Sequence, residues 1–222
     1  MPEQKHSGRF IVLEGVDGAG KGVQSRNLLS AMQAAGLDVI LTREPGGSPG
    51  AEEIRRLIVE GEVNRWDDMT ELLLIYAARR SHLVETIWPA LEKGTWVISD
   101  RFADSSRAFQ GIAGNLGLEA VEIVHQQVVG DFQPDLTLIL DLDPSISLYR
   151  AGARGGSEDR FEQKGLGYQQ RVRDGFRLLA SQSPQSKVLI DAGGSIDEVF
   201  TRIVQAVNEK LALQLPVSVK NT

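Results

Sequence analysis

The sequence predicts an α/β protein with a mostly parallel, five-stranded sheet. Short apolar runs, each of strand length, alternate with longer segments that have helical spacing. A glycine-rich segment directly follows the first run, and charged residues follow the next three runs. In sheets of this class, ligands bind beyond the carboxyl ends of the strands, so the residues after each run are the candidates for function.

The predicted elements follow one another without a linker, a repeat or a low-complexity segment. Strands are expected at residues 9–13, 38–42, 95–99, 135–141 and 187–190, and helices near residues 21–35, 50–60, 68–93, 117–130, 144–152, 165–182 and 195–212. With 222 residues, 41% of them hydrophobic, the chain can bury a sizeable core, so residues 1–222 are expected to form a single domain. Residues 213–222 are expected to form a loose tail.

The composition argues against several classes of protein. There is no cysteine, and the three histidines, His6, His82 and His125, are too scattered to suggest a ligand set, so disulfides and zinc sites are not expected. A net charge of −6 argues against a nucleic-acid surface, which needs a broad basic face. The longest apolar stretch, residues 72–78, is too short for a membrane span, and no export signal is visible. We therefore expect a cytoplasmic protein with neither nucleic-acid nor membrane partners.

The glycine-rich segment GVDGAGKG matches most of a phosphate-binding loop. In the full pattern, backbone amides surround the phosphates, a lysine reaches the outer phosphates, and a final Ser or Thr hydroxyl holds Mg²⁺. Lys21 is present here, but Gly22 stands where the hydroxyl is expected. The strand before the loop and the helix after it favour an ATP site made by Gly15, Val16, Asp17, Gly18, Ala19, Gly20, Lys21 and Gly22. A plain glycine-rich turn is the alternative, and a dinucleotide-binding fingerprint fits less well because its glycine spacing differs.

Polar residues also follow the next three predicted strands. The segments are TREPGG at 42–47, SDRF at 99–102 and DLDP at 141–144. Asp100 closes its strand, from where a carboxylate can hold Mg²⁺ or its waters across from a phosphate loop, so we expect a metal ligand there. Asp143 is instead expected to begin a helix, because Pro144 follows it.

A predicted lid covers about residues 150–161. The segment combines Arg150, Arg154 and Arg160 with several glycines that permit movement. Closure of such a loop over a nucleotide would bring these arginines to the phosphates. A solvated, charged surface loop is the alternative.

Arg79 is a further candidate, on the helix predicted over 68–93. Glu71, Ile75 and Arg79 are spaced by four residues and share one helix face, so Arg79 can point into a cleft. The spacing leaves open whether Arg79 or the adjacent Arg80 is ordinary surface charge.

The motifs that carry these residues are GVDGAGKG from Gly15, TREPGGSPGAE from Thr42, YAARRSH from Tyr76, DRFADSSRAFQG from Asp100, and PDLTLILDLDP from Pro134. Together with the arginine-rich loop, they resemble the motifs of the thymidylate kinases, bacterial type, which pass the γ-phosphoryl group of ATP to dTMP. The resemblance runs from Phe10 to about Asn208. It implies a three-layer, P-loop nucleoside monophosphate kinase fold, ATP with Mg²⁺, dTMP as the acceptor, and a homodimer.

The resemblance also implies a role for each matching position. Asp17 is expected near the deoxyribose 3′-hydroxyl, and Arg43 and Arg101 near the acceptor phosphate. Arg79 and Gln110 are expected near thymine. The other substrate-binding positions are Glu44, Pro45, Ile75, Ser105, Ser106 and Phe109. The catalytic positions are Lys21, Arg101, Arg150, Arg154 and Arg160, and Asp100 is the metal ligand.

Four positions depart from the family pattern. Gly22 stands in place of Ser or Thr, Ile75 in place of an aromatic that commonly stacks on thymine, Phe109 in place of the usual tyrosine, and Gly114 in place of an arginine found in many members. Each change removes a polar or aromatic contact. The departures keep two alternatives open: a kinase for another deoxynucleoside monophosphate, and a nucleotide-binding homologue with little turnover.

Overall fold

A parallel sheet of five strands forms the centre of the structure, a computed structural model that describes residues 8–62, 64–152 and 164–217. The strands are β1 (Phe10–Gly15), β2 (Val39–Arg43), β3 (Trp96–Asp100), β4 (Leu136–Asp141) and β5 (Lys187–Asp191). Their order is β2-β3-β1-β4-β5, and every neighbouring pair is parallel. The predicted α/β fold with a five-stranded parallel sheet is confirmed, and each strand begins and ends within two residues of its expected bounds.

The central strand β1 is buried along its whole length. Phe10 and Val12 pack in one apolar cluster, whereas Ile11 and Leu13 pack in the other, because successive side chains point to opposite faces of the sheet. A strand that is buried on both faces reads as a continuous apolar run, which is why residues 10–13 show no alternation.

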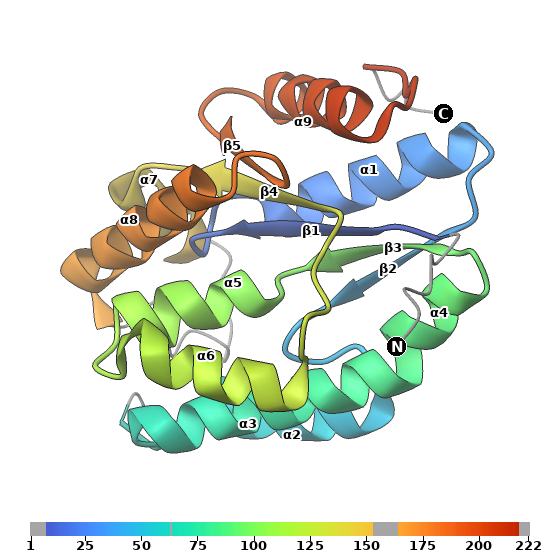
Figure 1. Cartoon of the computed structure of the whole chain (residues 1–222). Helices are drawn as coiled ribbons and strands as arrows, with labels where there is room; N and C mark the ends of the chain where they lie inside the picture. Colours follow the sequence, from blue (N-terminus) through green and yellow to red (C-terminus); the bar gives the residue numbers. More distant parts are fainter. Residues whose placement is uncertain (1–7, 63, 153–163, 218–222) are drawn as a thin grey trace.

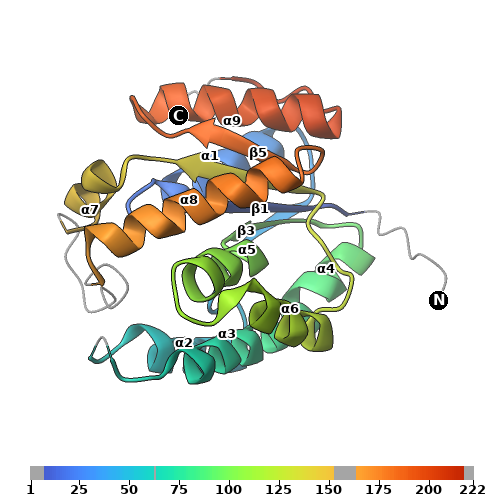
Figure 2. The same cartoon turned by 60° about the vertical axis from the view of Figure 1, so that its left-hand side comes forward.

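Helices cover both faces of the sheet, as Figures 1 and 2 show. On one face, α1 (Lys21–Ala34) and α9 (Ile196–Leu211) contact each other and, between them, all five strands. On the other face lie α4 (Trp88–Glu92), α5 (Ala103–Ser106) and α8 (Leu166–Gln182). The expected three-layer architecture is therefore present. Outside it, α6 (Gly117–Val128) packs on α3 (Asp68–His82), and α2 (Pro49–Val59) packs on α3.

The helix predicted over 68–93 contains a widened turn. α3 ends at His82, a π-helical turn η1 follows at Leu83–Ile87, and α4 continues from Trp88. Pro89 accounts for this change, because its ring has no N–H to donate and would clash with the carbonyl four residues earlier in a regular α-helix.

A helical segment at residues 103–112 was not predicted from the sequence. It consists of α5 and a second π-helical turn, η2 (Arg107–Ile112), and it begins directly after the carboxyl end of β3. The residue before it, Phe102, occupies the N-cap position, but its side chain accepts no hydrogen bond from the backbone of the first turn. The local start signal on which sequence reasoning depends is therefore missing.

The last described residues pack on α9, in contrast to the loose tail expected from residue 213. Leu215 is buried, and its backbone N–H donates to Asn208 Oδ1 at 2.8 Å. Leu213 packs against the same apolar cluster. Residues 218–222 lie outside the described part of the chain. Among the helices that the structure describes, none is both long enough and apolar enough to cross a membrane.

Candidate active site

The glycine loop lies between the carboxyl end of β1 and the start of α1, as predicted. Gly18 has a φ of +81°, and a Cβ atom there would lie 2.1 Å from the carbonyl oxygen of Ser147. Only glycine allows both this backbone conformation and this close approach of α7 (Pro144–Gly152). The loop is therefore held tightly against the helix that leads into the predicted lid.

Lys21 is the first residue of α1, and its side chain turns back into the loop. Its ammonium donates hydrogen bonds to the carbonyl oxygens of Gly15 at 3.1 Å and Val16 at 2.9 Å. Burial, together with the nearby charge of Arg101, lowers the pKa of Lys21 to about 8. A buried cation at a helix N-terminus, inside a glycine loop, is suited to binding phosphate oxygens.

Asp100 lies across from the loop, next to the position that lacks a hydroxyl. A Cβ atom on Gly22 would lie 3.5 Å from Asp100 Oδ2 and 3.6 Å from a guanidinium nitrogen of Arg26. Asp100 is also in register with Leu13 of β1 and with Arg43 of β2. The strand ends thus bring a carboxylate to the mouth of the loop, as the sequence predicted.

Arg101 connects the end of β3 to the glycine loop. Its φ is +74°, in the left-handed region that non-glycine residues rarely adopt. Its guanidinium donates to the Gly15 carbonyl at 2.9 Å, to Ser105 Oγ at 3.0 Å, and to the Asp17 carboxylate. Arg101 and Asp17, both predicted to bind the acceptor, are therefore brought together.

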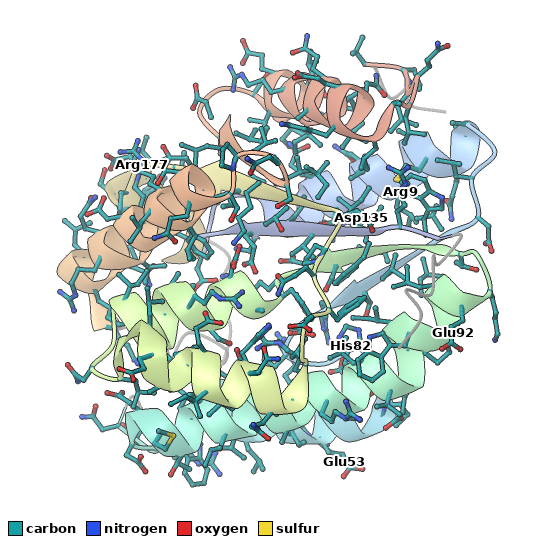
Figure 3. All side chains as sticks on the ribbon, viewed as in Figure 1. Arg9, Glu53, His82, Glu92, Asp135 and Arg177 are labelled. Atoms are coloured by element: carbon teal, nitrogen blue, oxygen red, sulfur yellow. The ribbon has the colours of Figure 1, made fainter. Side chains whose placement is uncertain are left out.

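Arg79 is buried and does not belong to the protein surface. Its guanidinium donates to Glu44 Oε2 at 2.7 Å, to Ser106 Oγ at 3.1 Å and to the Phe102 carbonyl at 3.0 Å. The other oxygen of Glu44 lies 3.0 Å from His82 Nδ1. Figure 3 shows His82 inside the molecule, on the α3 side of the sheet. Burial alone would raise the pKa of Glu44, but Arg79 and His82 outweigh it and lower that pKa.

Arg80 is the surface arginine of the pair. Its guanidinium lies 4.9 Å from the ring centre of Trp88 and donates to the Val128 carbonyl at 3.1 Å. Arg80 is therefore the surface charge of the two, because Arg79 lies on the buried side of α3.

Residues of the segment 103–112 form the opposite side of the site from α3. The Gln110 side chain donates to Glu71 Oε1 at 2.8 Å. The Phe109 ring lies 5.0 Å below the guanidinium of Arg101, and its carbonyl accepts a hydrogen bond from the Tyr168 hydroxyl at 2.8 Å. Phe109 is therefore a neighbour of Arg101, and Gln110 a neighbour of Glu71 on α3, although η2 was not predicted.

Two predicted positions, Arg43 and Ile75, are not drawn into this cluster, and Gly114, one of the four departures, has no room for a side chain. Arg43 is exposed and forms an ion pair with Glu52 at 3.1 Å. Ile75 is buried in a small apolar cluster with Ile58 and Val59 of α2. At Gly114, a Cβ atom would lie 2.6 Å from the Gln110 carbonyl, so the arginine that many family members carry would not fit this backbone.

The lid falls mainly outside the described residues. Arg154 and Arg160 both lie outside the described residues. For Arg150, the structure describes the backbone, which belongs to α7, but not the side chain. Asp143 begins α7, as expected: its Oδ1 accepts the N–H of Ser145 at 2.9 Å.

Sequence reasoning missed two carboxylates at the site. Glu14 is fully buried at the end of β1, and Asp141, at the end of β4, accepts hydrogen bonds from Arg173 at 2.7 Å and Arg177 at 2.7 Å. A charged residue between the apolar run of β1 and the glycine loop was the visible signal for Glu14. For Asp141, the signal was its place at the carboxyl end of a predicted strand, but its partners lie more than thirty residues away on α8.

The strand order, the glycine loop and the buried Lys21 define the chain as a P-loop kinase with the nucleoside monophosphate kinase fold. A family model described as Thymidylate kinase matches residues 13–203. This chain therefore belongs to the thymidylate kinase family.

Individual relatives agree with this assignment. The thymidylate kinase of Caulobacter vibrioides is 48% identical over 206 residues, which cover 93% of this chain and 99% of the relative. That of Ruegeria pomeroyi is 49% identical over 201 residues, 90% of this chain and 95% of the relative. The crystal structure of thymidylate kinase from Ehrlichia chaffeensis superposes with a TM-score of 0.73 at 30% identity, and covers 90% of this chain and 98% of that one.

Proposed function

We propose that this enzyme transfers the γ-phosphoryl group of ATP to dTMP, which gives dTDP and ADP, as a step in dTTP synthesis. The observation that carries the proposal is the pairing of two cationic sites: Lys21 inside the glycine loop, and Arg101 joined to Asp17 beside it. One suits the donor phosphates and the other suits an acceptor phosphate. The names of the relatives supply the nucleotide, dTMP.

On the donor side, the loop amides and Lys21 bind the phosphates of ATP. The lid arginines Arg150, Arg154 and Arg160 close over the transferring phosphoryl group and exclude water. On the acceptor side, Arg101 and Arg43 bind the phosphate of dTMP, and Asp17 accepts a hydrogen bond from the 3′-hydroxyl. Arg43 is free to turn inward because its ion pair with Glu52 is exposed and therefore weak.

The transfer needs no general base. An oxygen of the acceptor phosphate attacks the γ-phosphorus, the bond to the bridging oxygen of the β-phosphate breaks, and ADP leaves. A phosphate monoester has a second pKa of about 6, so it is largely dianionic at neutral pH. Positioning and charge neutralisation therefore supply the catalysis.

Mg²⁺ fits the groups at the mouth of the loop. No group of three or more His, Cys, Asp or Glu side chains that could hold a metal occurs among the described residues, but Mg²⁺ commonly takes only one or two carboxylates together with phosphates and waters. Asp100 supplies one carboxylate at the required place, across from Gly22. When bound with ATP, the ion would neutralise charge on the phosphate oxygens.

For the base, we propose that Arg79 and Gln110 contact thymine, with Ser105, Ser106, Glu44, Pro45, Ile75 and Phe109 lining the acceptor pocket. The hydrogen bonds of Arg79 and Gln110 to buried carboxylates fix their orientation. A kinase for another deoxynucleoside monophosphate is the second candidate, because Ile75 packs on α2 and offers no aromatic ring for stacking.

A coupled assay with ATP, Mg²⁺ and a panel of monophosphates tests the proposal. We expect dTMP to be turned over ahead of dUMP, dCMP, dGMP and dAMP. Faster turnover of another monophosphate would show that the acceptor assignment is wrong. If ATP and dTMP raise the melting temperature but no product forms, the protein is a nucleotide-binding homologue, because binding alone stabilises a fold.

Arg101→Ala is the matched test of the acceptor site. It should reduce kcat/KM for the acceptor by about 2–4 kcal/mol in transition-state free energy, because it removes a charged donor from a closed phosphate site. Arg80→Ala is the control, since its guanidinium lies on the surface of α3 over Trp88. Equal activity of the two variants would contradict the role of Arg101.

We also propose a homodimer that uses the face formed by α3, η1 and α6. Leu73, Val84 and Ile123 are exposed there, with exposed fractions of 52%, 46% and 61%. Sedimentation equilibrium of the wild type and of Ile123→Asp tests this, and a monomeric wild type at micromolar concentration would contradict it. The expected cytoplasmic location stays a prediction.

A further inference from the structure

Glu14 is a buried carboxylate that has no role in the transfer as described above. It is the residue before the last of β1, in the centre of the sheet, and it has no exposed surface. A charged group in such a place is unfavourable unless several hydrogen bonds satisfy it. Its partners therefore indicate why it is there.

All the described hydrogen bonds to the Glu14 carboxylate come from the segment that follows Arg101. Oε1 accepts the backbone N–H of Phe102 at 2.9 Å and that of Ser105 at 3.0 Å, and Oε2 accepts the Ser105 hydroxyl at 2.5 Å. Phe102 directly precedes α5 and Ser105 lies in its first turn, and the segment supplies no side-chain cap of its own. Glu14, on β1, therefore acts as the N-terminal cap of this helical segment.

The hydrogen bonds to Glu14 fix the backbone directly after Arg101, whose own backbone conformation is strained. Arg101 has a left-handed φ of +74°, a conformation that costs a non-glycine residue free energy and persists only where its surroundings enforce it. On one side of the turn, the N–H of Arg101 donates to the Leu13 carbonyl at 2.9 Å; on the other side, Glu14 fixes Phe102. The two adjacent residues of β1 therefore hold the turn from both sides.

A second path leads from Glu14 to the guanidinium itself. The Ser105 hydroxyl donates to Glu14 and accepts a hydrogen bond from Arg101 Nη1 at 3.0 Å. Ser105 therefore bridges the buried carboxylate and the acceptor arginine. Its hydroxyl proton is directed toward Glu14, which leaves its lone pairs for Arg101.

The charges of the two groups support each other. Burial raises the pKa of Glu14 to about 7, while the charge of Arg101 acts in the opposite direction and that of Asp104 on α5 adds to the rise. Lys21 on α1 and Arg79 on α3 also interact with this carboxylate. Glu14 is therefore surrounded by the cations that are expected to bind the two substrates.

We propose that Glu14 is a positioning residue for the acceptor phosphate: it holds the left-handed turn at Arg101 and, through Ser105, aims the guanidinium. This inference rests on the proposed function, in which Arg101 binds the acceptor. Glu14 does not touch either substrate, and it acts on acceptor binding and not on ATP binding.

The test compares Glu14→Gln with Asp135→Asn. Glutamine keeps an oxygen for the N–H groups of Phe102 and Ser105 but removes the charge and reverses the polarity toward the Ser105 hydroxyl. Asp135 is the matched control, because its carboxylate also accepts a backbone N–H of β1, that of Phe10 at 2.8 Å, at the other end of the strand. In Figure 3, Asp135 lies near Arg9 and far from Arg177, which marks the carboxyl ends of the strands.

Glu14→Gln should raise the KM for the acceptor by about tenfold and leave the KM for ATP within about twofold, because a charge-assisted contact is lost on one side only. Asp135→Asn should lower the melting temperature and leave both KM values unchanged. A folded Glu14→Gln protein with an unchanged acceptor KM, or with equal rises in both KM values, would overturn the proposal and show that Glu14 is only structural.

Ser105→Ala decides the matter if Glu14→Gln does not fold. It interrupts the bridge and leaves the buried carboxylate in place, and it should raise the acceptor KM by about three- to tenfold, more than Ser106→Ala does, which removes a hydroxyl from the same proposed pocket but not from the bridge. An unchanged KM would overturn the proposal.

The acceptor in these assays is whichever monophosphate the wild type turns over fastest, so the result does not depend on its being dTMP. If the wild type turns over none, the proposed function fails, and calorimetric binding of dTMP alone to the same variants tests Glu14. Weaker dTMP binding by Glu14→Gln with unchanged ATP binding would then support the inference, and equal dTMP binding would overturn it.

Discussion

Replacing Gly22 by serine should restore the missing hydroxyl of the phosphate loop at little steric cost. A Cβ atom at this position would lie 3.5 Å from Asp100 Oδ2 and 3.6 Å from Arg26, which are ordinary contact distances. The new hydroxyl would then lie next to the carboxylate proposed to hold Mg²⁺. We therefore expect Gly22→Ser to bind the metal directly where the wild type uses a water.

The substitution should change both the Mg²⁺ requirement and the melting temperature, for separate reasons. Replacing a water-mediated contact by a direct one should be worth about 1–2 kcal/mol, which lowers the Mg²⁺ concentration for half-maximal rate by about 5- to 30-fold. Gly22 is also the second residue of α1, where serine is more favourable than glycine by roughly 0.3–0.5 kcal/mol. For a domain of this size, that gain raises the melting temperature by about 1–2 °C.

The assay titrates Mg²⁺ at saturating ATP and dTMP, and thermal denaturation is followed without nucleotide. Gly22→Ala separates the two effects, because alanine stabilises the helix at least as well as serine but offers no hydroxyl. It should raise the melting temperature and leave the Mg²⁺ requirement unchanged. An unchanged or higher Mg²⁺ requirement in the serine variant would refute the reasoning and mean that the metal is held in some other way.

Three further predictions concern buried ionisable groups. Arg79→Met should lower the free energy of unfolding by about 3–5 kcal/mol, because the buried Glu44 carboxylate then keeps only His82 as a side-chain partner. In chemical denaturation, the double variant Arg79→Met/Glu44→Gln should lose less stability than the sum of the two single variants. Strict additivity would contradict the pairing. Burial, and then Arg107, lower the pKa of His125 to about 4, so the folded state disfavours its protonation, and stability should fall as the pH drops from about 6.5 toward 4. Melting curves of His125→Gln should lose this part of the pH dependence, and an unchanged slope would exclude His125 as its source. The pKa of Lys21 is about 8, and bound phosphates should raise it, so ATP binding at about pH 8.5 should be accompanied by proton uptake. Calorimetry in two buffers that differ in ionisation enthalpy measures this uptake. Lys21→Met should abolish it, and no uptake by the wild type would contradict the prediction.

Local patterns were sufficient for the sheet and for the glycine loop. Strands β1 and β4 are buried on both faces and appear as continuous apolar runs, a pattern typical of central strands in a chain whose strands alternate with helices. The loop is a contiguous motif, so its strand-loop-helix setting could be checked within about thirty residues of sequence. Asp100 could be placed for the same reason, since it directly follows a predicted strand.

Long-range contacts determined what the sequence could not predict. The segment 103–112 has its N-terminal cap in Glu14, which is 88 residues from Phe102 along the chain. Burial of Arg79 depends on Glu44, 35 residues away, and nothing in the spacing of the YAARRSH motif distinguishes it from Arg80. The tail has only isolated apolar residues, which predict a loose segment, but Asn208 on α9 binds the backbone of Leu215.

The polar contacts of the site also determine a feature of the fold, namely the register of β3 against β1. Val97 and Ile98 are both fully buried, so a shift by one residue would exchange one buried apolar side chain for another, and the apolar pattern alone specifies the register weakly. Two contacts between the strand ends depend on particular side chains: the Arg101 guanidinium donates to the Gly15 carbonyl at 2.9 Å, and Glu14 accepts the N–H of Phe102. A shifted strand would break the contact with Glu14 and leave its carboxylate buried without its partners, which is strongly unfavourable. The contacts that aim Arg101 therefore also select the pairing that brings Asp100 to the mouth of the glycine loop.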